Sequence, residues 1–207
     1  MSQADSGSNT EDARKKKKPL KISCTNTDCK NGLHYFGPNG RTKSKSKYPV
    51  GKCADCGADF VDWQKIGTRR PQNDQYKLEM LQKEWIRHYY WEHKKPTQRE
   101  INYAKRKGTK GLQGRAEEVL RGKVFAVSGW LNDVQTGYSG VIESAQHATA
   151  TCCRKCIAYW HGVPVDAKPT EDQITYLRQW IMKYIAARFP DISAEGEYVP
   201  PIKNKPS

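Results

Sequence analysis

Seven cysteines and five histidines are the residues of this chain with the most specific chemistry, and the cysteines fall into two stretches. One stretch, Ala145 to Pro164, reads AQHATATCCRKCIAYWHGVP and holds three of the cysteines and two of the histidines. Thiolates and imidazoles packed this closely are typical of a metal site or a reactive thiol, and not of ordinary core packing. Metal chemistry is therefore the first hypothesis for this stretch.

The candidate ligands of this stretch are His147, Cys152, Cys153, Cys156 and His161. A helix over about 151–160 would place Cys153 about 60° from Cys156, and Cys152 about 40° from Cys156, so either pair could chelate one ion. His161 would lie about 140° from Cys156 and could join only if the helix ends first. We favour His147, Cys153 and Cys156 as ligands, with the other two conditional. The alternatives are a catalytic thiol with a histidine base and cysteines buried for packing.

A second set of thiols comes earlier in the chain, at Cys24, Cys29, Cys53 and Cys56. The spacings Cys24-x4-Cys29 and Cys53-x2-Cys56 indicate two short knuckles, and Gly57 suits the positive φ that such a turn often needs. Two knuckles supply four thiolates to a tetrahedral zinc ion and leave no position for water. The pattern predicts a structural zinc ribbon that folds only with its metal. We expect zinc at both sites, with iron as the alternative metal at the later one.

The chain is strongly basic, with a formal net charge of +14 over 207 residues. Residues 1–70 hold 15 Lys and Arg against 7 Asp and Glu, whereas residues 71–207 hold 21 against 15. This charge favours a polyanionic partner, most often nucleic acid, contacted along its phosphates. The alternative is a basic protein that its charge keeps in solution. The candidate phosphate contacts are Arg41, Lys43, Lys45, Lys47, Arg69, Arg70 and Arg154.

Several classes of protein are disfavoured by the composition. No apolar run approaches the roughly 20 residues of a membrane span, and no signal-peptide core follows Met1. An odd number of cysteines in close pairs argues against a secreted disulfide framework. We therefore expect a cytoplasmic protein with nucleic acid as its main partner, a protein partner as a further option, and no membrane contact.

Hydrophobic periodicity and capping signals predict the helices that must position these side chains. Thr97 with Glu100, and Thr170 with Gln173, have the spacing of capping boxes that open helices. Gly108 suits the residue that follows a helix end. The expected helices cover about 75–93, 97–107, 112–120 and 170–189.

Short apolar runs predict strands, and shifts in composition predict boundaries. Strands are expected at 34–36, 59–63, 123–128 and 141–143. The expected units are a disordered basic tail (1–19), a zinc ribbon (20–70), a helical Cys/His domain (75–190) and a loose tail (191–207). The predicted fold class is α+β, a small N-terminal zinc ribbon followed by a mainly α-helical domain with a Cys/His metal site.

The stretch AQHATATCCRKCIAYWHGVP also resembles the signature of an uncharacterised bacterial family, a domain of unknown function marked by AQHATATCCRxCxxxWHGIP. The similarity extends over roughly residues 75–190. The resemblance implies that the five candidate ligands of the stretch form a unit, and that the zinc ribbon is an addition to the family domain. It implies no activity.

The predicted function is a zinc-binding protein that binds nucleic acid through basic surfaces, with the metal sites as scaffold. One alternative is a metal-dependent enzyme acting on nucleic acid, a nuclease or a base-modifying enzyme, that uses the His147–His161 site. No H-x-E or HExxH signature supplies a general base, and Glu143 is the only nearby carboxylate before His147. The other alternative is a protein-interaction module scaffolded by zinc. Whether the chain is an enzyme stays open at this point.

Overall fold

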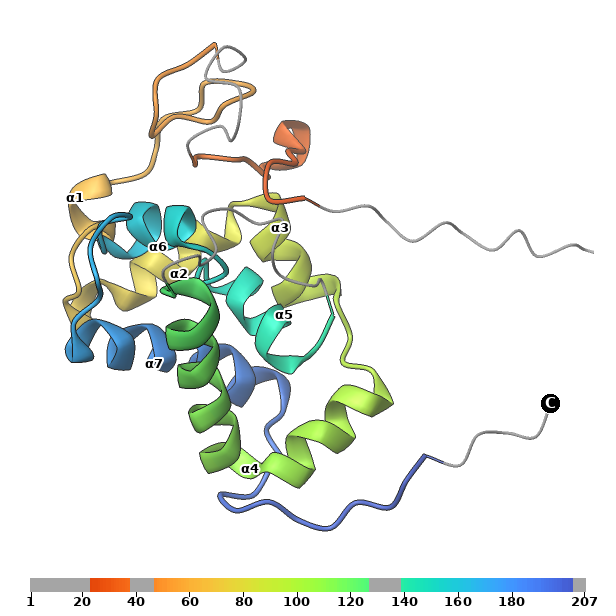
Figure 1. Cartoon of the computed structure of the whole chain (residues 1–207). Helices are drawn as coiled ribbons and strands as arrows, with labels where there is room; N and C mark the ends of the chain where they lie inside the picture. The colour runs from red at the N-terminus through yellow and green to blue at the C-terminus, as the bar shows by residue number, and fades with distance from the viewer. Residues whose placement is uncertain (1–22, 38–46, 127–138, 203–207) are drawn as a thin grey trace, which may run out of the picture.

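The computed structural model describes residues 23–37, 47–126 and 139–202, and these form a mainly helical protein (Figure 1). The basic run Arg14–Lys18 and the loop cations Arg41, Lys43 and Lys45 lie outside the described residues. In the three described ranges, no helix has the length and apolar character needed to cross a membrane.

The described chain contains α-helices of very different lengths. The α-helices, in order, are α1 (Trp63–Ile66), α2 (Asp74–Gln82), α3 (Trp85–His88), α4 (Gln98–Val119), α5 (Val141–Ala148), α6 (Arg154–His161) and α7 (Glu171–Arg188). Short 3-10 turns cover Cys29–Asn31 and Pro71–Asn73, and single π-helical turns follow α3 (Tyr89–His93) and α4 (Leu120–Val124).

Helix α5 is the centre of the fold, and it contains the first part of the cysteine-rich stretch. It packs against α3, α4 and α7, and all of its residues except Glu143 are buried (Figure 1). The strand predicted at 141–143 is wrong, because these residues form the first turn of α5. A short apolar run fits a buried helix as well as a strand, and only the surrounding helices decide between them.

The helix predicted over 75–93 is interrupted at Glu84, whose extended backbone (φ −83°, ψ 131°) separates α2 from α3. The interruption has a tertiary cause. The His34 amide donates to the Lys83 carbonyl at 2.7 Å, and the Trp85 amide donates to the His34 carbonyl at 3.1 Å. The N-terminal segment thus takes backbone groups that a continuous helix would use for itself.

The capping boxes predicted at Thr97–Glu100 and Thr170–Gln173 are confirmed at the starts of α4 and α7. As predicted, Gly108 interrupts the helical backbone: its non-helical dihedral angles (φ 61°, ψ 175°) form a kink that divides α4 into two helical parts. A Cβ there would lie 2.4 Å from the backbone carbon of Glu195, so glycine is needed for close approach as well as for the dihedral angle.

The segment expected to be a loose C-terminal tail is held against the kink in α4. The Thr109 amide donates to the Ser193 carbonyl at 2.9 Å, and the Glu197 amide donates to the Lys105 carbonyl at 3.0 Å. The kink leaves these helical backbone groups open, and the following chain pairs with them.

No β-sheet forms among the described residues, where the only pairings are isolated bridges between Asp28 and Leu33 and between His34 and Glu84. The strands predicted at 34–36 and 59–63 are therefore wrong as strands, and Trp63 instead begins α1. The strand predicted from residue 123 overlaps the π-helical turn that ends at Val124, and its last residues lie outside the described ranges. Backbone groups beside the cysteines form hydrogen bonds within tight turns, such as Gly57 to Cys53 and Gly32 to Cys29, in place of hydrogen bonds between strands.

Aromatic packing joins the N-terminal segment to the helices. The Trp63 ring lies 4.4 Å from the Tyr159 ring and 5.3 Å from the Trp160 ring, measured between centroids. Phe36 is fully buried in the same cluster. Phe36 is therefore a core residue, and the partly buried Trp63 packs against α6 and holds the N-terminal segment on the helices.

Candidate metal centres

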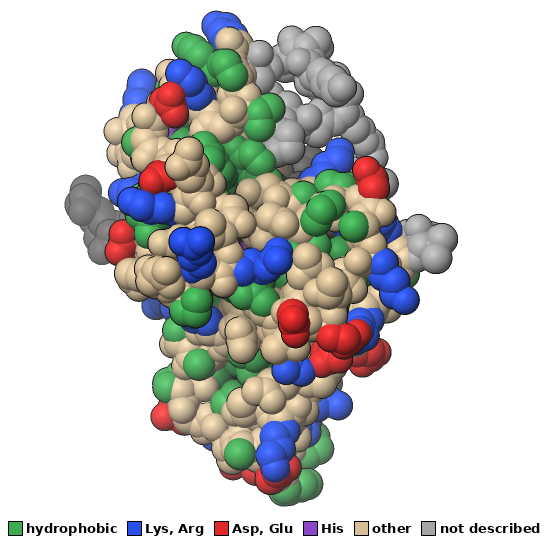
Figure 2. All heavy atoms as spheres, turned by 90° about the vertical axis from the view of Figure 1, so that its left-hand side faces the viewer, with side chains coloured by type: hydrophobic (Ala, Val, Ile, Leu, Met, Phe, Trp, Pro, Cys, Tyr) green, Lys and Arg blue, Asp and Glu red, His purple; other side chains and the backbone are tan. Residues whose placement is uncertain are grey.

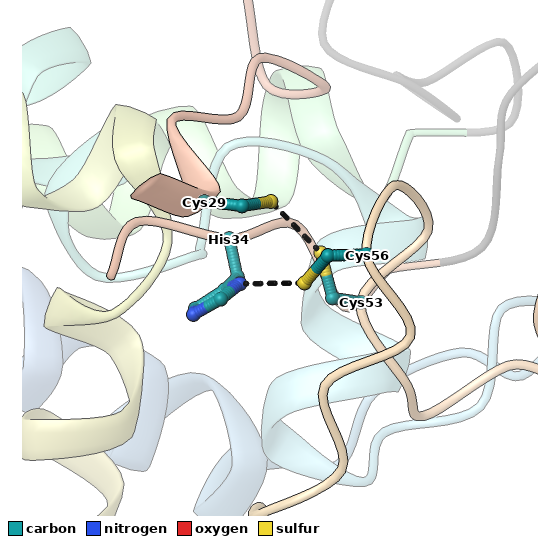
Figure 3. Close-up of side chains that lie close together, drawn as sticks. All are labelled: Cys29, His34, Cys53 and Cys56. Carbon is teal, nitrogen blue, oxygen red and sulfur yellow. Dashed lines mark hydrogen bonds between the residues drawn. The ribbon is translucent and has the colours of Figure 1, made fainter. Parts of the chain in front are cut away.

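The structure brings together one group of four donors in the N-terminal region, called here the first centre. Its members are Cys29, His34, Cys53 and Cys56. Their ligand atoms lie within 4.8 Å of one another, and Figure 3 shows the four side chains converging on one point. Cys24, which the sequence grouped with these cysteines, lies elsewhere, and His34 takes the fourth position.

The spacing of these donor atoms fits a tetrahedral zinc ion. The Sγ atoms of Cys29 and Cys53 are 3.7 Å apart, and Cys56 Sγ lies 3.5 Å from His34 Nδ1. Zn–S bonds of about 2.3 Å and Zn–N bonds of about 2.0–2.1 Å imply tetrahedral edges of about 3.8 Å and about 3.6 Å respectively. A zinc ion held by these four residues would be saturated with protein ligands and would serve as a structural ion.

Local backbone geometry places these four side chains. The Gly57 amide donates to the Cys53 carbonyl at 3.0 Å, and Gly57 has the positive φ of 76° that the sequence predicted for this knuckle. The other knuckle ends at Gly32, with φ of 73°, after which the chain turns back and brings His34 beside the thiols. The spacing Cys29-x4-His34 was the signal in the sequence that could have identified the histidine.

The pKa values of two thiols in the first centre are shifted in opposite directions. Partial burial and hydrogen bonds to the Cys56 and Cys53 thiols raise the pKa of Cys29 to about 12. Burial acts to raise the pKa of Cys53, but hydrogen bonds from nearby backbone amides and from His34 outweigh it and lower this pKa to about 6. One thiol thus ionises readily while another keeps its proton, which a divalent cation would displace on binding.

A second set of donors lies where the cysteine-rich stretch meets the N-terminal segment, and we call it the second centre. It consists of two overlapping groups that share Cys152, and its members are Cys24, His147, Cys152, Cys153 and Cys156. Cys24 Sγ lies 3.8 Å from His147 Nδ1. The ligand atoms of each group lie within 4.8 Å of one another, so either group can supply three protein ligands to one ion.

Both Cys152 and Cys153 can reach this centre because neither lies inside a helix. The sequence predicted a helix over about 151–160, in which adjacent cysteines would diverge. Helix α6 begins only at Arg154, and Cys153 is its N-cap residue, with extended backbone (φ −159°, ψ 164°). The Cys156 amide donates to Cys153 Sγ at 3.5 Å. The Cys153 thiol caps the N-terminus of the helix, so the helix begins after both cysteines and does not contain them.

The second centre contains a buried ion pair that sequence reasoning missed. Arg87 on α3 is 1% exposed, and its Nη2 donates to Cys156 Sγ at 3.3 Å while its Nη1 donates to the His147 carbonyl at 2.6 Å. Arg87 Nε lies 3.3 Å from a carboxylate oxygen of Glu84, which is also 1% exposed. A guanidinium in this position would offset the negative charge of thiolates if they bind a metal ion.

Burial and hydrogen bonds between the thiols shift the pKa values of the cysteines in the second centre in different directions. Hydrogen bonds from Cys153, Cys156 and Cys24 lower the pKa of Cys152 well below its usual value, against the effect of burial. The corresponding hydrogen bonds to Cys152 and Cys156, with burial, raise the pKa of Cys24 and of Cys153. Only a bound cation would allow several of these thiols to ionise together.

His161, a conditional ligand from the sequence, does not lie with these donors. Its Nε2 is 2.8 Å from the Thr149 carbonyl, and its Nδ1 is 3.4 Å from the Tyr176 hydroxyl. Burial, with a smaller effect of the Lys77 charge, lowers the pKa of His161 to about 3, so the ring is neutral at physiological pH. Gly162, with φ of 64°, ends α6 directly after this histidine. His161 serves as a hydrogen-bonded core residue on the opposite side of the helix.

Lys77 is buried beside His161, and this burial predicts a pH dependence of stability. Its Nζ donates to the Thr68 carbonyl and to the Tyr176 hydroxyl, and burial lowers its pKa to about 8. The unfolded chain, with a lysine pKa near 10.4, binds more protons than the folded protein at pH values between the two. The free energy of unfolding should therefore rise with pH in this window, by at most about 1.4 kcal/mol per unit from this group.

Urea unfolding of wild type and Lys77→Met at pH 7.5, 8.5 and 9.5 tests this expectation. The difference between the two proteins removes the contribution of the thiols, which titrate in both. Lys183→Met is the matched control, because its Nζ also lies over the Trp180 ring, at 4.5 Å, but its side chain is 40% exposed. Parallel slopes for wild type and Lys77→Met would contradict the assignment.

The basic residues predicted to contact phosphate fall into three groups. Lys47, Arg69 and Arg70 are exposed. Arg154 is partly buried and donates to the carbonyls of Val124 and Ala126 at 2.9 and 2.6 Å, so its guanidinium is already used within the fold. The other three residues lie outside the described ranges. Figure 2 shows Lys and Arg side chains spread, among fewer acidic ones, over the face that carries α1 and α7.

A family model described as "Domain of unknown function (DUF4186)" matches residues 57–186, which is more than half of the chain. No solved structure matches the chain. The match covers the cysteine-rich stretch and α1 to α6 with most of α7, and it begins one residue after Cys56.

Proposed function

This chain belongs to the family described as Domain of unknown function (DUF4186), and because that description names no activity, we propose a function from the two centres and the surface. We propose a zinc-binding protein in which two structural ions hold a basic N-terminal segment on a helical domain. This assembly binds nucleic acid through contacts with the phosphate backbone.

The observation that carries the zinc assignment is the geometry of the first centre. Distances of 3.7 Å between two thiols and 3.5 Å between a thiol and an imidazole match the edges of a zinc tetrahedron. Two of the four residues, Cys29 and Cys56, are half-buried or exposed, so hydrophobic packing alone does not explain why they converge. Soft thiolate and imidazole donors select zinc over the hard cations magnesium and calcium.

The burial of the second centre supports a structural ion there and disfavours the enzyme alternative. A catalytic zinc ion keeps one position open to water or substrate. Four of the five donors are less than 5% exposed, so water or substrate would have little access to an ion held by either group of three. The cavity of about 600 Å³ beside Arg99 and Arg115, and the cavity of about 330 Å³ beside Trp85 and His88, are lined by none of these donors.

The charge distribution supports a nucleic-acid partner. Formal net charge is +14, and exposed Arg69 and Arg70 adjoin α1, which also carries exposed Lys65. These cations lie on and after α1, between Cys56 of the first centre and the start of α2, so the zinc-bound turn and the helices on either side would hold them in place. Contacts between such cations and phosphates release counterions, and the resulting affinity depends on salt and not on base sequence.

Metal content and salt-dependent binding test the proposal together. Protein purified with zinc should hold two equivalents by elemental analysis. Its affinity for a labelled 20-nucleotide oligomer, measured by fluorescence anisotropy, should fall steeply between 50 and 200 mM salt. Arg69→Glu with Arg70→Glu should weaken binding at least about tenfold at low salt and reduce the slope of log K against log salt by roughly 1–2.

The matched control is Arg106→Glu with Lys107→Glu, an adjacent exposed pair on α4 that changes the net charge by the same amount. An equal loss of affinity in both double variants would mean that only net charge matters, and would contradict the assigned surface. Affinity that does not change with salt would contradict phosphate contacts altogether.

A further inference from the structure

One short segment supplies donors to both centres. Cys24 lies with His147 and Cys152 in the second centre, whereas Cys29 and His34 belong to the first. Only four residues separate Cys24 from Cys29, so the segment cannot move at one end without displacing the other. A short stretch of backbone therefore joins the two centres, and it can span at most about 3.3–3.6 Å per residue.

This stretch of backbone is held in a defined conformation. The amides of Asp28 and Leu33 donate to the carbonyls of Leu33 and Asp28 at 2.8 and 3.0 Å, which closes the turn that carries Cys29. Thr27 Oγ1 donates to a carboxylate oxygen of Asp55 at 2.9 Å, which connects the segment to the second knuckle of the first centre. Ordering of the first centre thus fixes the backbone directly after Cys24.

A second route between the centres passes through buried side chains. The Phe36 amide, two residues after His34, donates to Glu84 Oε1 at 3.1 Å. Glu84 pairs with Arg87 at 3.3 Å, and Arg87 donates to Cys156 Sγ at 3.3 Å. Every member of this chain except Cys156 is buried. The backbone just after His34 and the thiol of Cys156 therefore both contact the same Glu84–Arg87 ion pair.

We propose that Cys24 is a ligand of the second centre and that the two centres bind their metals cooperatively. Metal in the first centre orders the segment that presents Cys24, and metal in the second centre holds Cys24 and thereby orders the knuckle of Cys29. Binding of the first ion meets the entropic cost of ordering the segment. The second ion then binds without that cost and therefore more tightly. This inference rests on the proposed function, since it requires two metal sites.

The test is a cobalt titration of each centre with and without the other, against a competing chelator and followed by thiolate–cobalt absorption. Cys29→Ser with Cys56→Ser removes the first centre at positions that are not fully buried. We expect the second centre of this variant to bind cobalt about 5- to 150-fold more weakly than in wild type. Cys152→Ser removes the second centre and should weaken the first by the same factor, because coupling between binding sites is reciprocal.

Two further variants separate coupling from damage to the fold. An insertion of four glycines between Thr25 and Asn26 keeps every donor, so both centres should fill, but each with weaker affinity than in wild type. Lys30→Ser is the control, because Lys30 is exposed beside Cys29 and is not a donor; its two affinities should equal those of wild type.

The outcomes distinguish this inference from the proposed function. Wild-type protein that takes up fewer than two equivalents would overturn the proposed function. Two equivalents whose affinities are the same with and without the other centre would leave that function standing and overturn only the coupling. An insertion variant with wild-type affinities at both centres would likewise overturn the role of the Cys24 segment.

Discussion

Cys152→Ser is expected to remove one of two zinc equivalents and to lower the free energy of unfolding by about 3–5 kcal/mol. Cys152 is the donor common to both groups of the second centre and is fully buried. A serine hydroxyl does not ionise at neutral pH and does not replace a thiolate as a zinc ligand. Loss of the ion also leaves the buried Arg87 guanidinium without thiolate charge to offset its own.

Elemental analysis and urea unfolding of the purified variant measure the two parts of this expectation. Ser144→Ala is the matched control, because Ser144 lies on α5 together with His147, is 3% exposed and has no hydrogen-bond partner for its hydroxyl in the described structure. Its substitution should change stability by less than about 1 kcal/mol. A Cys152→Ser protein that still holds two zinc equivalents would exclude Cys152 as a ligand.

Arg87→Met is expected to destabilise the protein by a similar amount, about 3–5 kcal/mol, for a different reason. The substitution keeps an unbranched side chain of comparable length but leaves Glu84 as a buried carboxylate without its cation. Burial already raises the pKa of Glu84, and loss of Arg87 would raise it further. The acid should therefore take up a proton on folding in the variant, and its stability should fall as the pH rises above about 5.

A double-mutant cycle isolates the ion pair from the packing of the two side chains. Glu84→Gln with Arg87→Met removes both charges, and we expect the double variant to be more stable than the sum of the single effects by about 1–3 kcal/mol. Arg121→Met is the exposed control, because Arg121 pairs with Glu117 and Glu171 on the surface; it should cost less than about 1 kcal/mol. Additive effects of the two buried substitutions would show that the pair does not act as a unit.

The local parts of this structure follow from the sequence alone. The capping boxes at Thr97 and Thr170 start α4 and α7 where the spacing of threonine and its Glu or Gln partner predicted. Gly57 has the positive φ that its place after Cys56 required. Such features depend on residues within four positions of one another, so hydrogen bonds along the chain determine them whatever the rest of the fold does.

Glycine 108 shows the limit of such local arguments. Its left-handed backbone was predicted, and it is present. The contact at the kink was not predicted: the chain at 193–197 fills the space that a side chain at this position would have needed. Local preference decided the dihedral angle and the break in the helix, and residues more than eighty positions away decided what packs against that break.

The sequence by itself determined that this chain carries two sets of soft donors, that helices surround the later set, and that the surface is basic. Which donors share an ion was decided by tertiary structure, which places Cys24 beside His147, brings His34 to Cys56 and turns His161 away. The reason is physical. Spacing limits which neighbouring residues can chelate one ion together. The second centre also needs residues more than a hundred positions apart, Cys24 and His147. Whether these come together depends on how the helices pack and on the buried Glu84–Arg87 pair between the two centres.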